Sequence, residues 1–223
     1  MVHISSPGFA GTRRVMIFID GAYLRRNMKK MFQHDEINYE LLVNELRTFT
    51  SYGKLFPELI RAYYYDANFK AEQTDMILDN DDDIELDPVA MDMLAPIYEE
   101  KQSIFREQEK YLKQFKNYDY FEVRLGRLKK TKRGLKQKGV DTIIAIDMIS
   151  KAYENHYDVA VLLSGDDDLL DVVNIVKNTG KRVFGAFFEK TISQELQDSF
   201  DKRKILTMEY MKNIQPAYKT RQT

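Results

Sequence analysis

The sequence contains no cysteine and only three histidines, which restricts the metal chemistry open to it. Without cysteine the chain can form neither a disulfide framework nor a thiolate metal site. Oxygen atoms are then the main remaining ligands, and they favour hard cations such as Mg²⁺ or Mn²⁺. Any metal site in this protein is therefore expected to be built from carboxylates.

Long apolar runs are also missing. No stretch approaches the roughly 18 uninterrupted apolar residues of a membrane helix, and the N-terminus lacks a basic stretch followed by an apolar run. We therefore expect no membrane partner and a cytoplasmic location. The hydrophobic fraction of 43% is ordinary for a packed protein, and 223 residues suit one domain with an insertion.

The formal net charge of -1 conceals a strong segregation of charge. Residues 71–100 include eleven acidic side chains and no basic one, whereas residues 124–138 include eight basic side chains and no acidic one. An isolated charge run is usually a solvated loop. We predict a flexible leader over residues 1–13, one domain over 14–206 with an acidic insertion at 71–93 and a basic segment at 124–138, and a C-terminal tail over 207–223.

Apolar runs alternate with helical patterns along the chain. Strands are predicted over residues 15–19, 59–65, 120–123, 159–163 and 182–187, with helices between them, the longest over 94–115. This alternation, with connections long enough for crossovers, predicts an α/β fold. Its sheet should be mostly parallel, with about five strands and helices on both faces.

Four aspartates are placed where such a fold would bring them together. Asp20, Asp166 and Asp168 follow predicted strands, and Asp141 lies in the first turn of a predicted helix. Ligands of open parallel sheets collect outside the carboxyl ends of the strands. Crowded carboxylates repel one another unless a cation lies between them. We therefore predict that these four residues bind Mg²⁺ or Mn²⁺ and catalyse phosphodiester hydrolysis, in which metal activates water and stabilises the leaving oxygen.

Two further aspartates have simpler interpretations. A lone aspartate after a strand is more often a turn or helix cap than a ligand, and Asp167 is assigned to that class. Asp147 lies six residues after Asp141, which is about 240° around a helix. It is therefore expected to have a structural or supporting role.

The aspartates belong to an ordered set of short motifs: Phe18-Ile19-Asp20-Gly21, Arg61-Ala62-Tyr63-Tyr64-Tyr65-Asp66, Lys138-Gly139-Val140-Asp141 and Leu163-Ser164-Gly165-Asp166-Asp167-Asp168. In order and approximate spacing they resemble NYN domains of the LabA-like branch, over residues 14–206 apart from the acidic insertion. The resemblance implies a PIN-like fold and metal-dependent ribonuclease activity. It matches the four aspartates predicted above to the family's acidic positions.

The sequence departs from the family pattern at two positions. Leu169 replaces a common phenylalanine, which is ordinary variation of a core residue. Tyr23 stands where many members carry asparagine, three residues after Asp20. Two interpretations of Tyr23 stay open: its ring stacks on an unpaired base, or it packs between the first helix and a neighbouring segment.

The basic segment ends three residues before Asp141, so its far end must lie near the predicted metal site. Cations there could hold the phosphates that flank a scissile bond. The residues expected to contact nucleic acid, besides Tyr23, are Arg124, Arg127, Lys129, Lys130, Lys132, Arg133, Lys136 and Lys138.

Other functions fit the sequence less well. A haloacid-dehalogenase-type phosphotransferase would carry a second acid at Ala22, and a Toprim-type nuclease would carry a glutamate after its first strand. Two alternatives to an enzyme remain: a non-catalytic RNA-binding or regulatory scaffold, and a structural module that forms a homo-oligomer. RNA is the expected partner, with DNA left open.

Overall fold

The computed structural model describes residues 11–67, 112–131 and 134–216. The acidic insertion predicted at residues 71–93 lies outside the described residues, as does most of the helix predicted over 94–115. Of that helix, Leu112 and Lys113 are helical and lead into the 3₁₀ turn η1 (Gln114–Asn117).

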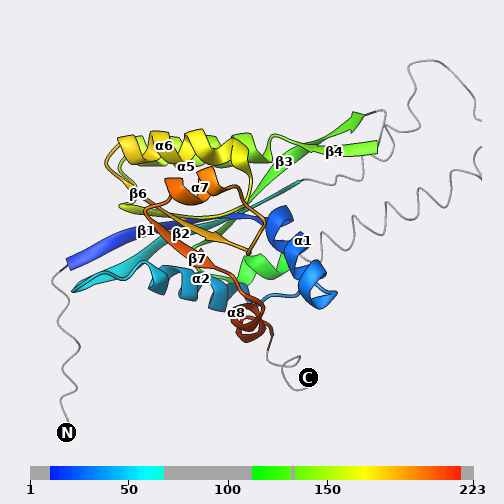
Figure 1. Ribbon diagram of the computed structural model, residues 1–223, viewed down its shortest axis with the longest axis horizontal. Coiled ribbons are helices and arrows are strands. Elements are labelled where there is room, and N and C mark those ends of the chain that lie inside the picture. Colours follow the sequence, from blue (N-terminus) through cyan, green and yellow to red (C-terminus); the bar gives the residue numbers. More distant parts are fainter. Residues whose placement is uncertain (1–10, 68–111, 132–133, 217–223) are drawn as a thin grey trace, which may run out of the picture.

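A seven-stranded sheet forms the centre of the molecule, in the order β4-β3-β2-β1-β5-β6-β7 (Figure 1). Its strands are β1 (Gly11–Asp20), β2 (Leu55–Ala67), β3 (Phe121–Thr131), β4 (Gly134–Lys138), β5 (Val159–Leu163), β6 (Arg182–Phe187) and β7 (Lys202–Ile205). Six strands are parallel, and β4 pairs antiparallel with β3. The predicted α/β class with a mostly parallel sheet is confirmed.

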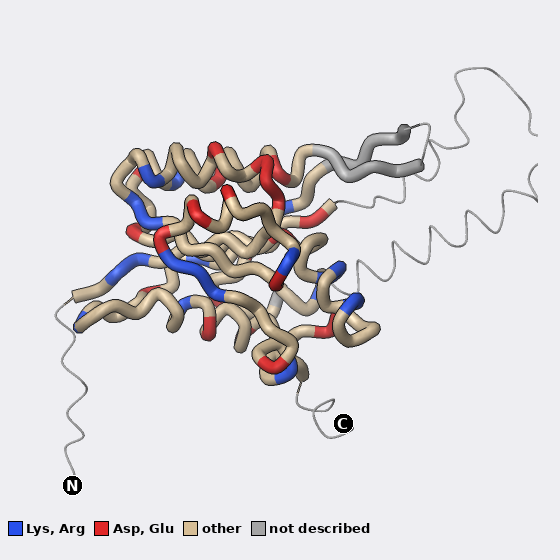
Figure 2. The backbone as a smooth tube through the Cα atoms, viewed as in Figure 1, with Lys and Arg blue, Asp and Glu red and all other residues tan. Residues whose placement is uncertain are grey.

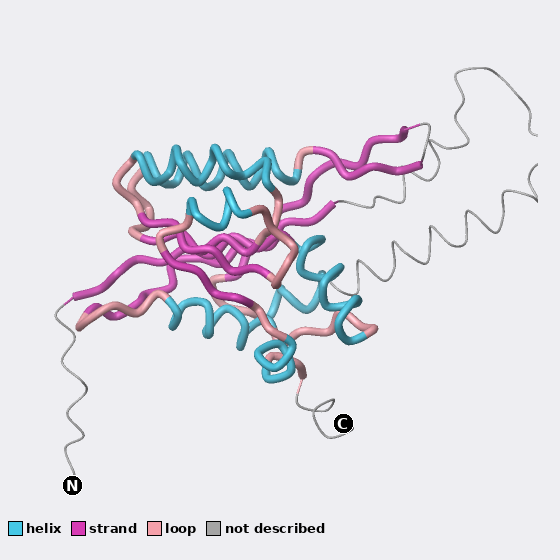
Figure 3. Tube along the Cα trace, viewed as in Figure 1, coloured by secondary structure: helices cyan, strands magenta, loops and turns pink. Residues whose placement is uncertain are grey.

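Helices cover both faces of the sheet (Figures 1 and 3). They are α1 (Gly21–Phe32), α2 (Tyr39–Phe49), α5 (Val140–Tyr153), α6 (Leu170–Asn178), α7 (Gln194–Ser199) and α8 (Met208–Asn213). The views place α5, α6 and α7 over one face and α2 and α8 over the other. Every residue of β5 is buried, as are residues 15–20 of β1, because parallel strands between two helical layers contact side chains on both faces.

The element boundaries differ from the predictions at both ends. β1 begins at Gly11, inside the predicted leader, and Arg13 is buried with its Nη1 donating to the carbonyl oxygen of Thr50 at 2.9 Å. The predicted tail contains α8, where Met211 and Ile214 are buried and the Ile214 carbonyl accepts the Asn38 amide. The folded unit therefore includes residues that were assigned to the leader and the tail.

The sheet also has more strands than predicted. β7 reads Lys-Arg-Lys-Ile and is mostly exposed, so it lacks the apolar signal of an inner strand. Charged residues suit an edge strand because they discourage pairing with another chain. β4 comes from the basic segment, over which no strand beyond residue 123 was predicted. In the structure it forms the second arm of a hairpin with β3.

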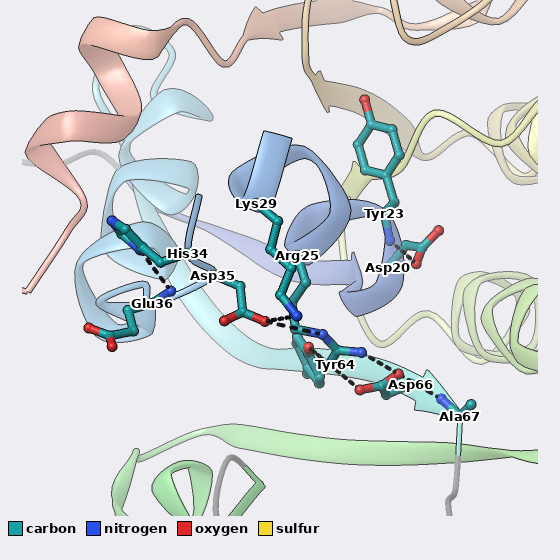
Figure 4. A network of polar contacts seen from close by, with 10 residues as sticks. All are labelled: Asp20, Tyr23, Arg25, Lys29, His34, Asp35, Glu36, Tyr64, Asp66 and Ala67. Carbon is teal, nitrogen blue, oxygen red and sulfur yellow. Dashed lines mark hydrogen bonds and ion pairs between the residues drawn. The ribbon is translucent and has the colours of Figure 1, made fainter. Parts of the chain in front are cut away.

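A buried ion pair fixes α1 against β2. Asp66, 1% exposed at the end of β2, accepts two bonds from the Arg25 guanidinium, one of them from Nη2 to Oδ1 at 3.0 Å. Arg25 Nη1 also donates to the Tyr64 hydroxyl at 2.7 Å (Figure 4). Because a bidentate pair of this kind satisfies both ions, losing one partner leaves an uncompensated charge in the interior.

We predict that Asp66→Ala lowers the free energy of unfolding by about 3 to 5 kcal/mol, as expected when one member of a buried ion pair is removed. The measurement is chemical denaturation. Asp35→Ala is the comparison: Asp35 pairs with Lys29 at 3.3 Å and more loosely with Arg25 at 4.0 Å on a more exposed surface, so its loss should cost at most about 1 kcal/mol. Equal effects of the two substitutions would show that the Arg25–Asp66 pair has no special role.

Among the described residues, no helix combines the length and apolar character needed to cross a membrane.

Candidate functional site

The sheet reverses its strand order at its centre, between β1 and β5. From β1 the chain continues to β2 on one side, whereas from β5 it continues to β6 on the other. In open α/β sheets such a reversal creates a crevice at the carboxyl ends of the two strands. Asp20 is the last residue of β1, and Ser164 follows the last residue of β5. The fold therefore brings two of the sequence motifs to the position where ligands bind.

The Asp20 carboxylate is fixed by two hydrogen bonds. Its Oδ1 accepts the Tyr23 amide at 2.9 Å, which makes Asp20 the N-cap of α1 (Figure 4). Its Oδ2 accepts the Ser164 hydroxyl at 3.2 Å, a bond between residues 144 positions apart. The first residue of the helix is glycine, because a Cβ at position 21 would lie 2.2 Å from the Tyr64 ring. Asp20 is consequently held at 8% exposure.

The turn after β5 extends this arrangement. The Ser164 hydroxyl, which donates to Asp20, also accepts the Asp166 amide at 3.2 Å. Asp166 in turn accepts the Asp168 amide at 3.0 Å and caps the 3₁₀ turn η2 (Asp167–Leu169). Asp167 and Asp168 are exposed, so Asp20 and Asp166 form the inner part of the site.

Asp141 reaches the site from helix α5. It lies in the first turn of that helix, two residues after Gly139, which adopts φ +85 and follows β4 with a left-handed turn. A left-handed residue favours glycine, which explains the Gly-Val-Asp spacing. Asp141 is partly buried, and its pKa is raised by burial and by the charges of Asp166 and Asp168.

The strongest electrostatic perturbation among these acids is at Asp20. Its pKa is raised to about 6, chiefly by burial and further by the charges of Asp141 and Asp166, although the bonds from Tyr23 and Ser164 oppose this shift. A carboxylate that only caps a helix would have its pKa lowered, because the helix N-terminus favours negative charge. The charges of Asp141 and Asp166 therefore act on Asp20, and those of Asp166 and Asp168 act on Asp141.

The donor chemistry suits a hard divalent cation, because all four side chains supply carboxylate oxygens. Their arrangement is looser than a formed coordination sphere. Within residues 11–67, 112–131 and 134–216, no group of three or more His, Cys, Asp or Glu residues is close enough to hold a metal ion. The carboxylates fit a metal by chemistry and shared location, and would have to move closer together to bind it.

Tyr23 lies in the interior of the site's supporting structure. It is 6% exposed, and its ring lies 5.8 Å from that of Phe188. Its hydroxyl accepts the Phe188 amide at 3.0 Å and bonds to Thr191, whose own proton goes to the Phe188 carbonyl. A Cβ at Gly165 would lie 2.5 Å from the Tyr23 ring. This burial favours packing over base stacking, because the ring faces protein on several sides.

The basic segment forms the hairpin of β3 and β4, which projects from the sheet beside the carboxyl ends of the central strands (Figure 1). Its last residue, Lys138, precedes the Gly139 turn that leads to Asp141. Arg124, at the start of the segment, pairs with Glu122 at 2.9 Å and with Asp147 at 3.8 Å. Arg124 is therefore already engaged with carboxylates, which weakens its assignment to nucleic-acid binding.

Asp147 is occupied by contacts with its own helix and with β2. It is 8% exposed, accepts the Tyr65 hydroxyl at 2.9 Å and pairs with Lys151 at 2.8 Å. These contacts agree with the structural role expected from its position on the helix. Ser164 and Thr191, in contrast, were not singled out from the sequence. Only the pairing of β1 with β5 gives Ser164 its role, since nothing local links it to Asp20.

We predict that Tyr23→Ala lowers the free energy of unfolding by about 3 to 5 kcal/mol, because it leaves a cavity. Tyr23→Phe should cost about 1 to 3 kcal/mol, since it leaves the buried Phe188 amide without its acceptor. Tyr153→Ala, at a tyrosine 71% exposed, is the control and should change stability by less than about 0.5 kcal/mol. A stable Tyr23→Ala protein with weakened binding of single-stranded RNA would instead support stacking.

Comparison with known proteins agrees with this arrangement. The family model described as the NYN domain matches residues 14–207. The crystal structure of a protein of unknown function from Vibrio parahaemolyticus shares the fold, with a TM-score of 0.53, 19% identity, and coverage of 88% of this chain and 94% of that chain. No curated protein matches the chain. Since the family model spans most of its length, the chain belongs to the NYN domain family, a PIN-like family of nucleases.

Proposed function

We propose that this protein is a divalent-metal-dependent ribonuclease that hydrolyses RNA phosphodiester bonds. Its metal, Mg²⁺ or Mn²⁺, would be held by Asp20, Asp141, Asp166 and Asp168. Membership of the NYN family supports a nuclease and a nucleic-acid substrate. The choice of RNA, the metal and the ligand residues are our proposal.

One observation carries the proposal: a carboxylate that is 8% exposed lies at the carboxyl ends of the two central parallel strands, within electrostatic range of two further acids. Burying acids together is unfavourable unless a cation or protons neutralise them. A helix-capping role accounts for the bond from Tyr23 to Asp20. It does not account for the convergence of acids from β1, the β5 turn and α5, which a metal site does.

The chain's own residues divide the work of such a site. Asp20 is held by the Tyr23 amide and the Ser164 hydroxyl, so it provides a rigid ligand at the floor of the crevice. Ser164 also ties the Asp166 backbone to that floor, and Asp168 remains exposed at the rim. A metal bound here would lower the pKa of a water molecule and stabilise the leaving oxygen. No protein nucleophile is required.

The β3–β4 hairpin supplies the expected approach path for RNA. Its basic residues lie along a segment whose base is three residues from Asp141. Cations beside a carboxylate site offset the repulsion between the acids and the phosphates of the substrate. RNA and DNA share the phosphodiester backbone, so it is the resemblance to NYN domains that favours RNA as the substrate.

We expect the purified protein to cut single-stranded or structured RNA in Mg²⁺ or Mn²⁺ and to be inactive with chelator. Asp20→Asn and Asp166→Asn should each reduce cleavage at least about 100-fold, the upper end of the cost of losing a residue that merely supports a metal ligand. Asp167→Asn is the matched control from the same turn and should retain activity. RNA and DNA panels with gel readout provide the measurement, and full activity in both ligand variants would contradict the proposal.

The raised pKa of Asp20 also predicts how stability depends on pH without metal. Between its ordinary value of 3.8 and about 6, the folded state binds the proton more tightly than the unfolded chain. Stability should therefore fall as pH rises through this window. Each pKa unit corresponds to about 1.4 kcal/mol, so thermal unfolding in chelator should occur several degrees lower at pH 7 than at pH 5.

Asp20→Asn removes this titration and should unfold at a higher temperature than the native protein at pH 7 in chelator. Added Mn²⁺ should raise the unfolding temperature of the native protein and have little effect on the variant. Parallel pH profiles for the two proteins, or equal stabilisation by Mn²⁺, would contradict the assignment of Asp20.

A further inference from the structure

Helix α1 carries four cations in its last two turns, and they fall into two pairs with different surroundings. Arg25 and Lys29 are engaged by acids: Arg25 binds Asp66, and Lys29 pairs with Asp35 at 3.3 Å (Figure 4). These interactions fix α1 to β2 and to the segment after the helix. They account structurally for half of the basic charge on the helix.

Arg26 and Lys30 form the second pair and are both exposed. In the part of the chain that the structure describes, neither side chain has a hydrogen bond or an ion pair. They are four positions apart, so they lie on the same side of α1, one turn from each other. Two adjacent unpaired cations repel each other, although Lys30, in the last turn, also lies at the helix end that favours positive charge.

This side of α1 continues toward the carboxylate site. Tyr23, three positions before Arg26, lies on the same side and packs beneath the turn that carries Asp166. Lys190 is a further exposed cation in the loop that bonds to Tyr23.

The position of α1 places this surface beside the crevice. The helix begins at Asp20, so Arg26 and Lys30 lie roughly 9 and 15 Å along its axis from the N-cap. Figure 2 shows the basic residues of α1 at one end of the sheet, and Figure 1 shows the β3–β4 hairpin projecting from the same end. The hairpin and α1 thus both lie at the end of the sheet that carries the acids of the crevice.

We propose that Arg26 and Lys30 bind the phosphates of a nucleic-acid strand a few nucleotides from the bond that is cut. The proposal rests on the proposed function for the identity of the ligand as a substrate. Its physical basis is that exposed acids such as Asp168 repel phosphates, so a strand entering the crevice needs cations on either side of the metal. Arg26 and Lys30 meet this need with charges that no acid of the described chain neutralises.

The experiment measures strand binding without cleavage. Fluorescence anisotropy in chelator, over a range of salt concentrations, is recorded with single-stranded RNA and single-stranded DNA of the same sequence. The test variant is Arg26→Gln with Lys30→Gln. The charge-matched control is Lys54→Gln with Arg182→Gln, two exposed residues at the amino end of the sheet. Thermal unfolding confirms that both variants remain folded.

For single strands, the slope of log affinity against log salt is about 0.7 for every phosphate that the protein neutralises. Removing both cations should therefore reduce the steepness of this slope by about 1.4 with both strands, and the control should match the native protein. An unchanged slope, an equal reduction in the control, or absence of strand binding by the native protein would overturn the proposal. A reduction confined to RNA would do so as well, because it would assign the two cations to the 2′-hydroxyl or bases.

Cleavage assays on the same proteins separate this proposal from the proposed function. If the native protein cuts no RNA in Mg²⁺ or Mn²⁺ but the slope falls in the test variant, the phosphate surface stands and the ribonuclease assignment fails. If Asp20→Asn abolishes cleavage while the test variant keeps the native slope, the enzyme stands and this surface does not guide its substrate.

Discussion

The hydrogen bond from the Ser164 hydroxyl to Asp20 joins the carboxyl ends of the two central strands, and the site depends on it. β1 and β5 are adjacent in the sheet although their residues are more than a hundred positions apart in the chain. Their parallel register places Ile19 opposite Leu163, so the residues that follow each strand meet at one edge. This hydrogen bond fixes Asp20, at the end of β1, to the turn that follows β5.

The burial of Asp20 explains the electrostatic character of the site, although the bond from Ser164 by itself lowers the pKa of Asp20. Holding Asp20 between β1 and the β5 turn removes it from water, which raises its pKa, and brings it within range of Asp141 and Asp166. Such an arrangement is unfavourable for an isolated protein and favourable for one that binds a cation. The remaining structure maintains it: Tyr23 and Thr191 pack around the turn, and the Arg25–Asp66 pair fixes the helix that Asp20 caps.

Basic charge is distributed according to two different needs. Arg25, Lys151 and Arg124 are paired with buried or partly buried acids and stabilise the contacts of α1, α5 and β3. The outer side of α1 carries the exposed cations Arg26 and Lys30, and the sequence of the β3–β4 hairpin is rich in lysine and arginine. A net charge near zero therefore coexists with local surfaces of opposite sign, and these surfaces are what a phosphate backbone would sense.

Much of the fold followed from the sequence because its signals are local. Continuous apolar runs such as residues 159–163 predict buried parallel strands, and Asn38 caps α2 as its position before an apolar periodic segment indicates. The placement of Asp20, Asp166 and Asp168 after strands was enough to predict that they share one edge of the sheet. Asp147 was separated from them by the helical period alone.

Other features required the tertiary structure because they depend on interactions between distant residues. The exposed strand β7 has no apolar pattern, and only its pairing with β6 identifies it. The burial of Tyr23 depends on the loop after β6, more than 160 positions away, which supplies both partners of its hydroxyl. The sequence by itself determined which acids could meet. Strand pairing and packing decided how deeply Asp20 is buried, which serine holds it and which cations on α1 are paired with acids.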